Sequence, residues 1–152
     1  MKPIEIQVTA QGRKSSQEIC EEFLDTDRWP EFTGYSILPG IKSAHFEIKT
    51  PDIVGSRIRA HNTDGSSHVE EIIEWDPAEW FVLKFQEFSP PVKYFASHFI
   101  ETWVFQKSAE GTAVVRTMAL YPTGFVGRLI LRPISKLMRK AFESHMADLF
   151  RD

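Results

Sequence analysis

The chain has 152 residues, 42% of them hydrophobic, and a formal net charge of −3. This length and composition predict one globular domain, residues 1–152, that buries roughly 70% of the surface exposed by the unfolded chain. The acidic balance argues against nucleic acid as a partner, because binding to phosphates needs clustered Lys and Arg. The single cysteine, Cys20, excludes an internal disulfide and a cysteine-based metal cluster, and it suits a reducing compartment.

The N-terminal residues predict a strand and then a short helix. Polar and apolar residues alternate over residues 3–10, which is the pattern of a strand and not the apolar run of a secretion signal. We therefore expect a cytoplasmic protein. Ser15 and Glu18 have the spacing of a capping box, which predicts that a short helix lies within residues 14–25.

The segment DTDRWPEFTGYS follows and combines aromatic residues with carboxylates. Asp25 is expected to cap a helix end, and Pro30 suits the first turn of a second short helix. Trp29 and Phe32 are three residues apart, so they fall on the side of that helix that can meet the sheet. We expect them to form one wall of a cavity, and the hydroxyl of Tyr35 is a candidate ligand contact.

Six further segments are rich in β-branched and aromatic residues, as strands are. Asp64-Gly65 is a favoured two-residue hairpin turn, and Ser108 to Gly111 closes another hairpin. Strands joined by turns this short are antiparallel neighbours, so the segments form a meander. The predicted strands span residues 43–50, 55–62, 66–75, 79–88, 98–107 and 112–121.

The C-terminal residues predict a long amphipathic helix that starts near Thr123. Residues 125–152 carry six Lys and Arg against three Asp and Glu, so this segment is basic on an acidic chain. Pro133 removes one backbone hydrogen bond and is expected to kink the helix or to split it in two. The apolar residues with helical spacing are Phe125, Leu129, Ile130, Ile134, Leu137, Met138, Ala141, Phe142 and Leu149.

Together these elements resemble a known superfamily. The stretches DTDRWPEF, VGSRIRA, IIEWDPAEWFVLKF and GRLILRPISKLMRKAFE, and above all the hairpin ETWVFQKSAEGTAVVRTMALYP, are similar to the START-related helix-grip (SRPBCC) superfamily, which includes polyketide cyclase/dehydrase-like, lipid-transport and Bet v 1-like proteins. The resemblance covers nearly the whole chain. It implies an α+β fold in which a curved seven-stranded antiparallel sheet grips the long helix around a hydrophobic cavity, with two short helices after the first strand. The fold alone does not choose among the activities of its members.

The turn at residues 108–111 sets a register for the last two strands. In this register Trp103 lies opposite Arg116 and Glu101 lies opposite Met118, all on one face, which we take as the interior because it is aromatic. Two interpretations of Glu101 and Arg116 remain open. They form a structural ion pair, because an unpaired buried charge is costly, or Arg116 anchors a carboxylate, phosphate or enolate oxygen of an apolar ligand, with Glu101 orienting it or acting as a base. The candidate ligand-binding residues are Trp29, Phe32, Tyr35, Phe85, Phe99, Glu101, Trp103, Arg116, Met118 and Met138.

The histidines do not add up to a metal site. A two-residue turn at Asp64-Gly65 places His61 opposite His68, but zinc normally needs at least three protein ligands and the spacing supplies no third. His98 is predicted to point outward. We expect no metal and no cofactor, and no nucleophile motif identifies a catalytic residue.

Two segments bear on how a ligand enters. The aromatic residues around Pro90-Pro91 either plug one end of the cavity or form a mobile lip at its entrance. Arg128, Arg132 and Lys136 recur every four residues, and they either form the solvated side of the helix or dock weakly on an anionic membrane. We expect membrane contact to be at most transient.

Three classes of function follow. The leading one is a binding or carrier protein for a hydrophobic small molecule such as a lipid, a polyketide or an aromatic compound. The second is a cyclase- or dehydratase-type enzyme that uses the same cavity. The third is an interaction module whose cavity is filled by the protein's own aromatic side chains. The sequence does not indicate an oligomeric state.

Overall fold

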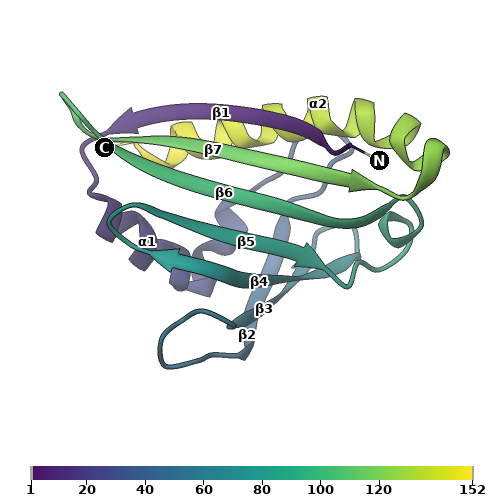
Figure 1. Ribbon diagram of the computed structural model, residues 1–152, viewed down its shortest axis with the longest axis horizontal. Helices are drawn as coiled ribbons and strands as arrows, with labels where there is room; N and C mark the ends of the chain where they lie inside the picture. Colours follow the sequence, from purple (N-terminus) through teal and green to yellow (C-terminus); the bar gives the residue numbers. More distant parts are fainter. Residues whose placement is uncertain (1, 152) are drawn as a thin grey trace.

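The computed structural model describes residues 2–151, which form a curved, seven-stranded antiparallel sheet along a long helix (Figure 1). The strand order is β1-β7-β6-β5-β4-β3-β2, so every strand from β2 to β7 pairs with its neighbour in sequence and β1 pairs with β7. The α+β class and the predicted meander are confirmed. The strands are β1 (Ile4–Gly12), β2 (Ile41–Ile48), β3 (Arg57–Asn62), β4 (Ser67–Asp76), β5 (Trp80–Gln86), β6 (Ala96–Ser108) and β7 (Gly111–Pro122).

Two short helices follow β1, as expected. The capping box is present, because Ser15 Oγ accepts a hydrogen bond from the Glu18 backbone N–H at 3.1 Å and the Glu18 carboxylate accepts one from the Ser15 N–H. Asp25 caps the second helix through its own side chain. Pro30 was wrongly placed in the first turn, since it is the fifth of the six residues of this 3₁₀ helix. The helices of the chain are α1 (Ser16–Leu24), η1 (Thr26–Glu31), η2 (Val92–Tyr94) and α2 (Gly124–Leu149).

The β6–β7 hairpin has the predicted register. Trp103 pairs with Arg116 and Glu101 pairs with Met118, and all four side chains are buried. The inner face of the sheet is therefore the aromatic one, because residues on one face of a strand alternate with those on the other.

The β3–β4 hairpin differs from the predicted register by one residue. The backbone N–H of Asn62 donates to the Ser66 carbonyl oxygen at 2.8 Å, and Gly65 has a φ of +89°. The turn therefore holds three residues and ends in a left-handed glycine, which is a known alternative for an Asp-Gly sequence. As a result His68 pairs with Ala60 on the inner face, and His61 pairs with Ser67 on the outer face.

The long helix α2 packs against β1 and β7 and runs without a break through Pro133, so the predicted split is wrong. Two arginines join it to the N-terminal segment, because Arg128 donates to the carbonyl oxygen of Lys2, which precedes β1, and Arg139 donates to that of Gln7 in β1. The buried residues of the helix are Gly127, Leu131, Ser135, Met138, Ala141, Phe142 and Met146.

The predicted apolar face of α2 needs one correction. Phe125 and Leu129 are 69% and 54% exposed, since the buried residues at the start of the helix are Gly127, which lies against Phe95, and Leu131. None of the helices within residues 2–151 combines the length and the apolar character that crossing a bilayer requires.

Candidate functional site

A cavity of about 680 Å³ lies between α2, the inner face of the sheet and the two short helices. Its walls are mostly apolar, with Met118 from β7, Leu131 from α2 and Trp29 from η1. A volume of this size is typical of small-molecule sites. The aromatic side chains of the chain therefore do not fill the interior, which argues against the filled-cavity class of function.

Nine of the ten predicted ligand-binding residues line this cavity, and Tyr35 does not. Tyr35 is 46% exposed and forms a small turn in which its backbone pairs with that of Leu38. This turn directs Leu38, instead of the tyrosine, to the cavity wall. The lining residues that were predicted are Trp29, Phe32, Phe85, Phe99, Glu101, Trp103, Arg116, Met118 and Met138.

Glu101 and Arg116 form a buried ion pair in the cavity wall. Nε of Arg116 donates to the Glu101 carboxylate, and the two residues are only 2% and 6% exposed. The guanidinium also lies between two aromatic rings, 3.7 Å from the centroid of Phe142 and 4.6 Å from that of Trp103. Such cation–π contacts stabilise a cation that has been taken out of water. Arg116 is therefore held firmly by the protein itself.

His145 on α2 completes this arrangement. Nη1 of Arg116 donates to Nδ1 of His145 at 2.9 Å, which requires that nitrogen to carry no proton. Burial, with the neighbouring Arg116 charge, lowers the pKa of His145 from 6.5 to about 3. The imidazole is therefore neutral at physiological pH and serves as an acceptor for Arg116.

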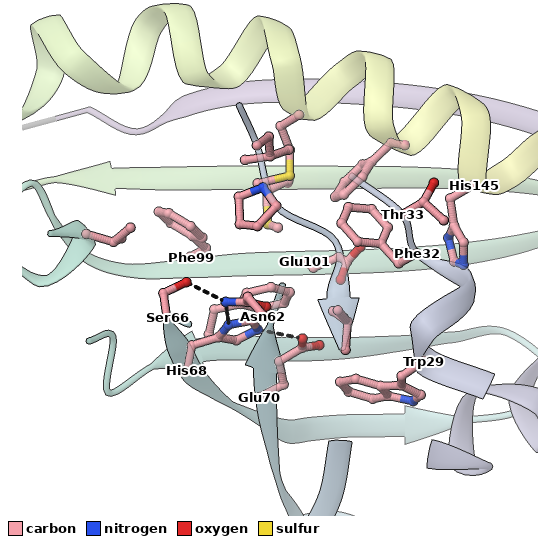
Figure 2. A pocket seen from close by; sticks show the side chains of 18 of the residues that line it. Trp29, Phe32, Thr33, Asn62, Ser66, His68, Glu70, Phe99, Glu101 and His145 are labelled. Carbon is pink, nitrogen blue, oxygen red and sulfur yellow. Dashed lines mark hydrogen bonds and ion pairs between the residues drawn. The ribbon is translucent and has the colours of Figure 1, made fainter. Parts of the chain in front are cut away.

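A second polar cluster lies at the end of β3, on the turn that follows and on β4 (Figure 2). Nε2 of His68 is 2.9 Å from Oε2 of Glu70, and Nδ1 of His68 is 3.4 Å from the side-chain nitrogen of Asn62. Asn62 also donates to Ser66 Oγ at 3.0 Å. Because the amide nitrogen of Asn62 can only donate, it fixes His68 as the tautomer whose Nε2–H points at Glu70.

Glu70 is the least compensated charge in this cluster. It is 4% exposed, and its one hydrogen-bond partner within residues 2–151 is His68. Burial raises the pKa of Glu70, the charge of Glu101 raises it further, and the hydrogen bond from His68 opposes both. A carboxyl group in this environment takes up a proton more readily than it does in water.

One oxygen of each buried carboxyl group opens to the cavity. Oε1 of Glu70 and Oε1 of Glu101 have no hydrogen-bond partner in the described part of the chain, yet neither atom is sealed off. The sealed side-chain atoms without a partner are Nε1 of Trp103 and Oγ of Ser108. Both glutamates point into the same space in Figure 2. A ligand in the cavity therefore meets two carboxyl groups.

Comparison with solved structures identifies the fold. Protein TTHA0849 of Thermus thermophilus matches with a TM-score of 0.70 and 20% identity over 95% of this chain and 92% of that protein. Major latex-like protein 151 of Panax ginseng matches with a TM-score of 0.64 and 14% identity over 97% and 98%. The chain has the helix-grip fold.

The helix-grip fold also occurs in the di-domain ARO/CYC protein StfQ from the steffimycin biosynthetic pathway. This chain matches 50% of StfQ with a TM-score of 0.65 and 13% identity, and 96% of this chain is covered. No protein-family model and no curated protein matches the sequence. At these identities the likeness establishes the fold and not the activity.

Among the polar residues of this helix-grip cavity that sequence reasoning missed are Asn62, His68, Glu70 and His145. His68 and Glu70 were missed because the turn after β3 was taken as two residues long, which paired His68 with His61 and did not identify either residue as facing inward. Gly65 was the available signal, since a glycine in this place serves a three-residue turn equally well. His145 lies three residues after Phe142 on the buried side of α2, so its spacing also pointed inward.

The remaining histidines do not face the cavity. His61 stacks on His45 on the outer face with ring centroids 5.6 Å apart, so it does not share a metal with His68. His98 stacks on Tyr121 and does not line the cavity, as predicted for an outward residue. Within residues 2–151, no three His, Cys, Asp or Glu side chains lie close enough to hold a metal ion.

The segment between β5 and β6 forms part of the cavity wall. Phe88 and Phe95 line the cavity, and Phe88 packs on Phe99 with ring centroids 4.7 Å apart. Tyr94 is 64% exposed and lies outside.

The cavity opens to the surface near Ile37, because this lining residue is 78% exposed.

Proposed function

We propose that the protein binds a hydrophobic small molecule in the cavity and carries it. The observation that supports this function is the cavity of about 680 Å³ with mostly apolar walls and a few inward-facing polar groups. Apolar walls supply the affinity, because transfer of apolar surface out of water is favourable. The polar groups supply the orientation of the ligand.

The polar groups favour a ligand whose polar end donates hydrogen bonds. Arg116 was a candidate anchor for an anion, but Glu101 and His145 already occupy two of its donor nitrogens. The unpartnered oxygens of Glu70 and Glu101 are acceptors whenever these groups are ionised. A lipid, polyketide or aromatic molecule with hydroxyl or amino groups fits this arrangement better than a free acid does.

A titration with the neutral fluorophore N-phenyl-1-naphthylamine tests the proposal. We expect saturable binding with one site per chain and a blue-shifted emission, because the probe moves from water into an apolar space. Met138→Trp should abolish this binding, since Met138 lines the cavity from α2 and a larger side chain fills it. Val126→Trp is the matched control, because Val126 is on the same helix but is 64% exposed and outside the cavity.

Equal binding to both variants would place the probe on the surface, and absence of binding to the unaltered protein would argue against an accessible cavity. Native mass spectrometry of the purified protein adds a second test. A co-purified apolar molecule is expected, and its release by the Met138→Trp substitution ties it to the cavity.

An enzyme of the cyclase or dehydratase type is the second candidate. It is favoured by one observation, the pairing of the buried carboxyl of Glu70 with His68 beside the ligand space. A carboxyl group with a raised pKa is suited to general acid–base catalysis near neutral pH. Chemical conversion of the co-purified molecule by the protein, lost in Glu70→Gln, would establish the enzyme, and unchanged recovery of the molecule would establish the carrier.

A further inference from the structure

The charged residues that line the cavity are mostly acidic. Six carboxyl groups and two guanidinium groups contribute to its walls, and no lysine does within residues 2–151. The acidic residues are Glu22, Glu31, Asp64, Glu70, Glu101 and Asp148, and the basic residues are Arg28 and Arg116. A cavity with this balance repels an anion and attracts a cation.

Both arginines of the cavity wall are already paired. Arg28 lies 3.0 Å from the Glu22 carboxylate and 3.1 Å from that of Glu31, at the rim. Arg116 binds Glu101 in the interior. An incoming carboxylate or phosphate would therefore have to compete with an existing carboxylate for either guanidinium.

Glu70 has no such cationic partner at hydrogen-bond distance. Its contact is to the Nε2–H of His68, and this histidine is held in one orientation by Asn62 on one side and by the ring of Phe85, stacked 5.0 Å away, on the other. His68 therefore orients the carboxyl group and leaves Oε1 toward the cavity. The charge of Arg116 acts on Glu70 only from a distance, and burial keeps the pKa of Glu70 above its usual value.

We propose that the ligand of this cavity is an apolar molecule with a protonated amino group, which binds the carboxylate of Glu70 while Glu101 faces the same space. This inference rests on the proposed ligand-binding function and names the chemical class of the ligand. An ammonium group brings a positive charge next to the Glu70 carboxylate and hydrogen-bond donors for its free oxygen, because it carries up to three N–H donors and no acceptor. The apolar part of the ligand then lies along the wall formed by Met118, Leu131 and Met138.

The proposal also fixes the direction of the pH dependence. Groups that face Glu70 are His68 on its own strand, Glu101 on β6 and Arg116 on β7, and His145 on α2 contacts Arg116. An ammonium ligand needs Glu70 ionised. Its affinity is therefore highest where Glu70 is ionised, and it falls as the pH is lowered and Glu70 takes up a proton.

Three ligands with the same twelve-carbon chain test the inference: dodecylamine, dodecanol and dodecanoate. Each is added below its micelle concentration to displace N-phenyl-1-naphthylamine at pH 8. We expect dodecylamine to bind about tenfold or more tightly than either of the others, a ratio of the size that one charge-assisted contact gives. Glu70→Gln should reduce this preference over dodecanol to about twofold or less.

Glu31→Gln is the matched control, because Glu31 also lines the cavity but lies half-exposed at the rim, paired with Arg28. This variant should keep the preference for the amine. If Glu70→Gln does not fold, the unaltered protein still provides a test, since its preference for dodecylamine over dodecanol must fall between pH 8 and pH 5. A constant preference over this range would overturn the inference.

The other outcomes separate the two proposals. If dodecanoate binds most tightly, or if all three bind equally, the ligand class is wrong while the ligand-binding function stands. If neither the fluorophore nor any of the three ligands binds, the ligand-binding function itself fails.

Discussion

Replacement of Arg116 by Met tests whether the buried ion pair is structural. The substitution keeps much of the side-chain volume but leaves the Glu101 carboxylate, which is 2% exposed, without its cation. Breaking a buried pair in this way typically costs about 3–5 kcal/mol. The contacts of the guanidinium with Phe142 and Trp103 are lost as well, and desolvated cation–π contacts contribute up to about 2 kcal/mol.

The expected loss of stability in Arg116→Met is large compared with the total stability of a native protein, about 5–15 kcal/mol. Urea unfolding followed by circular dichroism measures it, with the change in the midpoint converted by the common slope. A second variant, Arg116→Met with Glu101→Leu, removes both charges. We expect it to be more stable than Arg116→Met alone, because an apolar pair in place of a buried ion pair is often close to neutral.

The unaltered protein, Arg116→Met, Glu101→Leu and the double variant form a thermodynamic cycle that isolates the interaction of Glu101 with Arg116. A coupling free energy of about 2 kcal/mol or more is expected for a pair buried in this way. If Arg116→Met instead changes stability by less than about 1 kcal/mol, in the range of an exposed pair, and mainly weakens ligand binding, the arginine is a ligand anchor and the structural interpretation is refuted.

Three further predictions concern individual groups. Because the pKa of His145 is lowered from 6.5 to about 3, the unfolded chain binds a proton there that the folded protein does not, so this group removes stability as the pH falls from 6.5 toward 3. The free energy of unfolding changes with pH by at most about 1.4 kcal/mol per pH unit through this group. Urea unfolding should therefore show a weaker dependence of stability on acid pH for His145→Gln than for the unaltered protein. The same dependence in both proteins would contradict a neutral imidazole in the folded state. Burial raises the pKa of the Cys20 thiol to about 12, so Ellman's reagent should react with it only after unfolding in urea, and rapid reaction in the native protein would show that this thiol is accessible. Gly127→Ala would place a Cβ 2.4 Å from the carbonyl oxygen of Phe95. We expect this clash to lower the stability by about 1–3 kcal/mol, even though alanine is favoured over glycine in helices by about 1 kcal/mol. A more stable variant would show that α2 does not start against Phe95.

The β6–β7 hairpin shows what the sequence could predict. Its turn was taken as two residues long, between Ser108 and Gly111, and the structure has that turn, so the opposition of Trp103 and Arg116 followed from counting residues. Aromatic side chains on one face then identified the interior. The same reasoning gave the α+β class and most of the apolar lining of the cavity.

The β3–β4 hairpin shows that counting residues does not always predict the register of a hairpin. An Asp-Gly pair is compatible with turns of two or three residues, and a change of one residue moves every side chain of the strand to the other face. Only the structure therefore identified Glu70 and His68 as residues that line the cavity. The contact of His145 with Arg116 joins residues 29 positions apart and depends on how α2 lies across the sheet, which local patterns do not specify.

The location of a bound ligand can be measured directly by ¹H–¹⁵N NMR of the tryptophan indole groups during titration with dodecylamine. Trp29 and Trp103 line the cavity, whereas Trp80 is 39% exposed, lies outside it and donates to Glu74 on the surface. We predict that the indole signals of Trp29 and Trp103 shift in a saturable way while that of Trp80 stays constant. Shifts at Trp80 alone, or none at Trp29 and Trp103 when the ligand is saturating, would contradict binding within the helix-grip cavity.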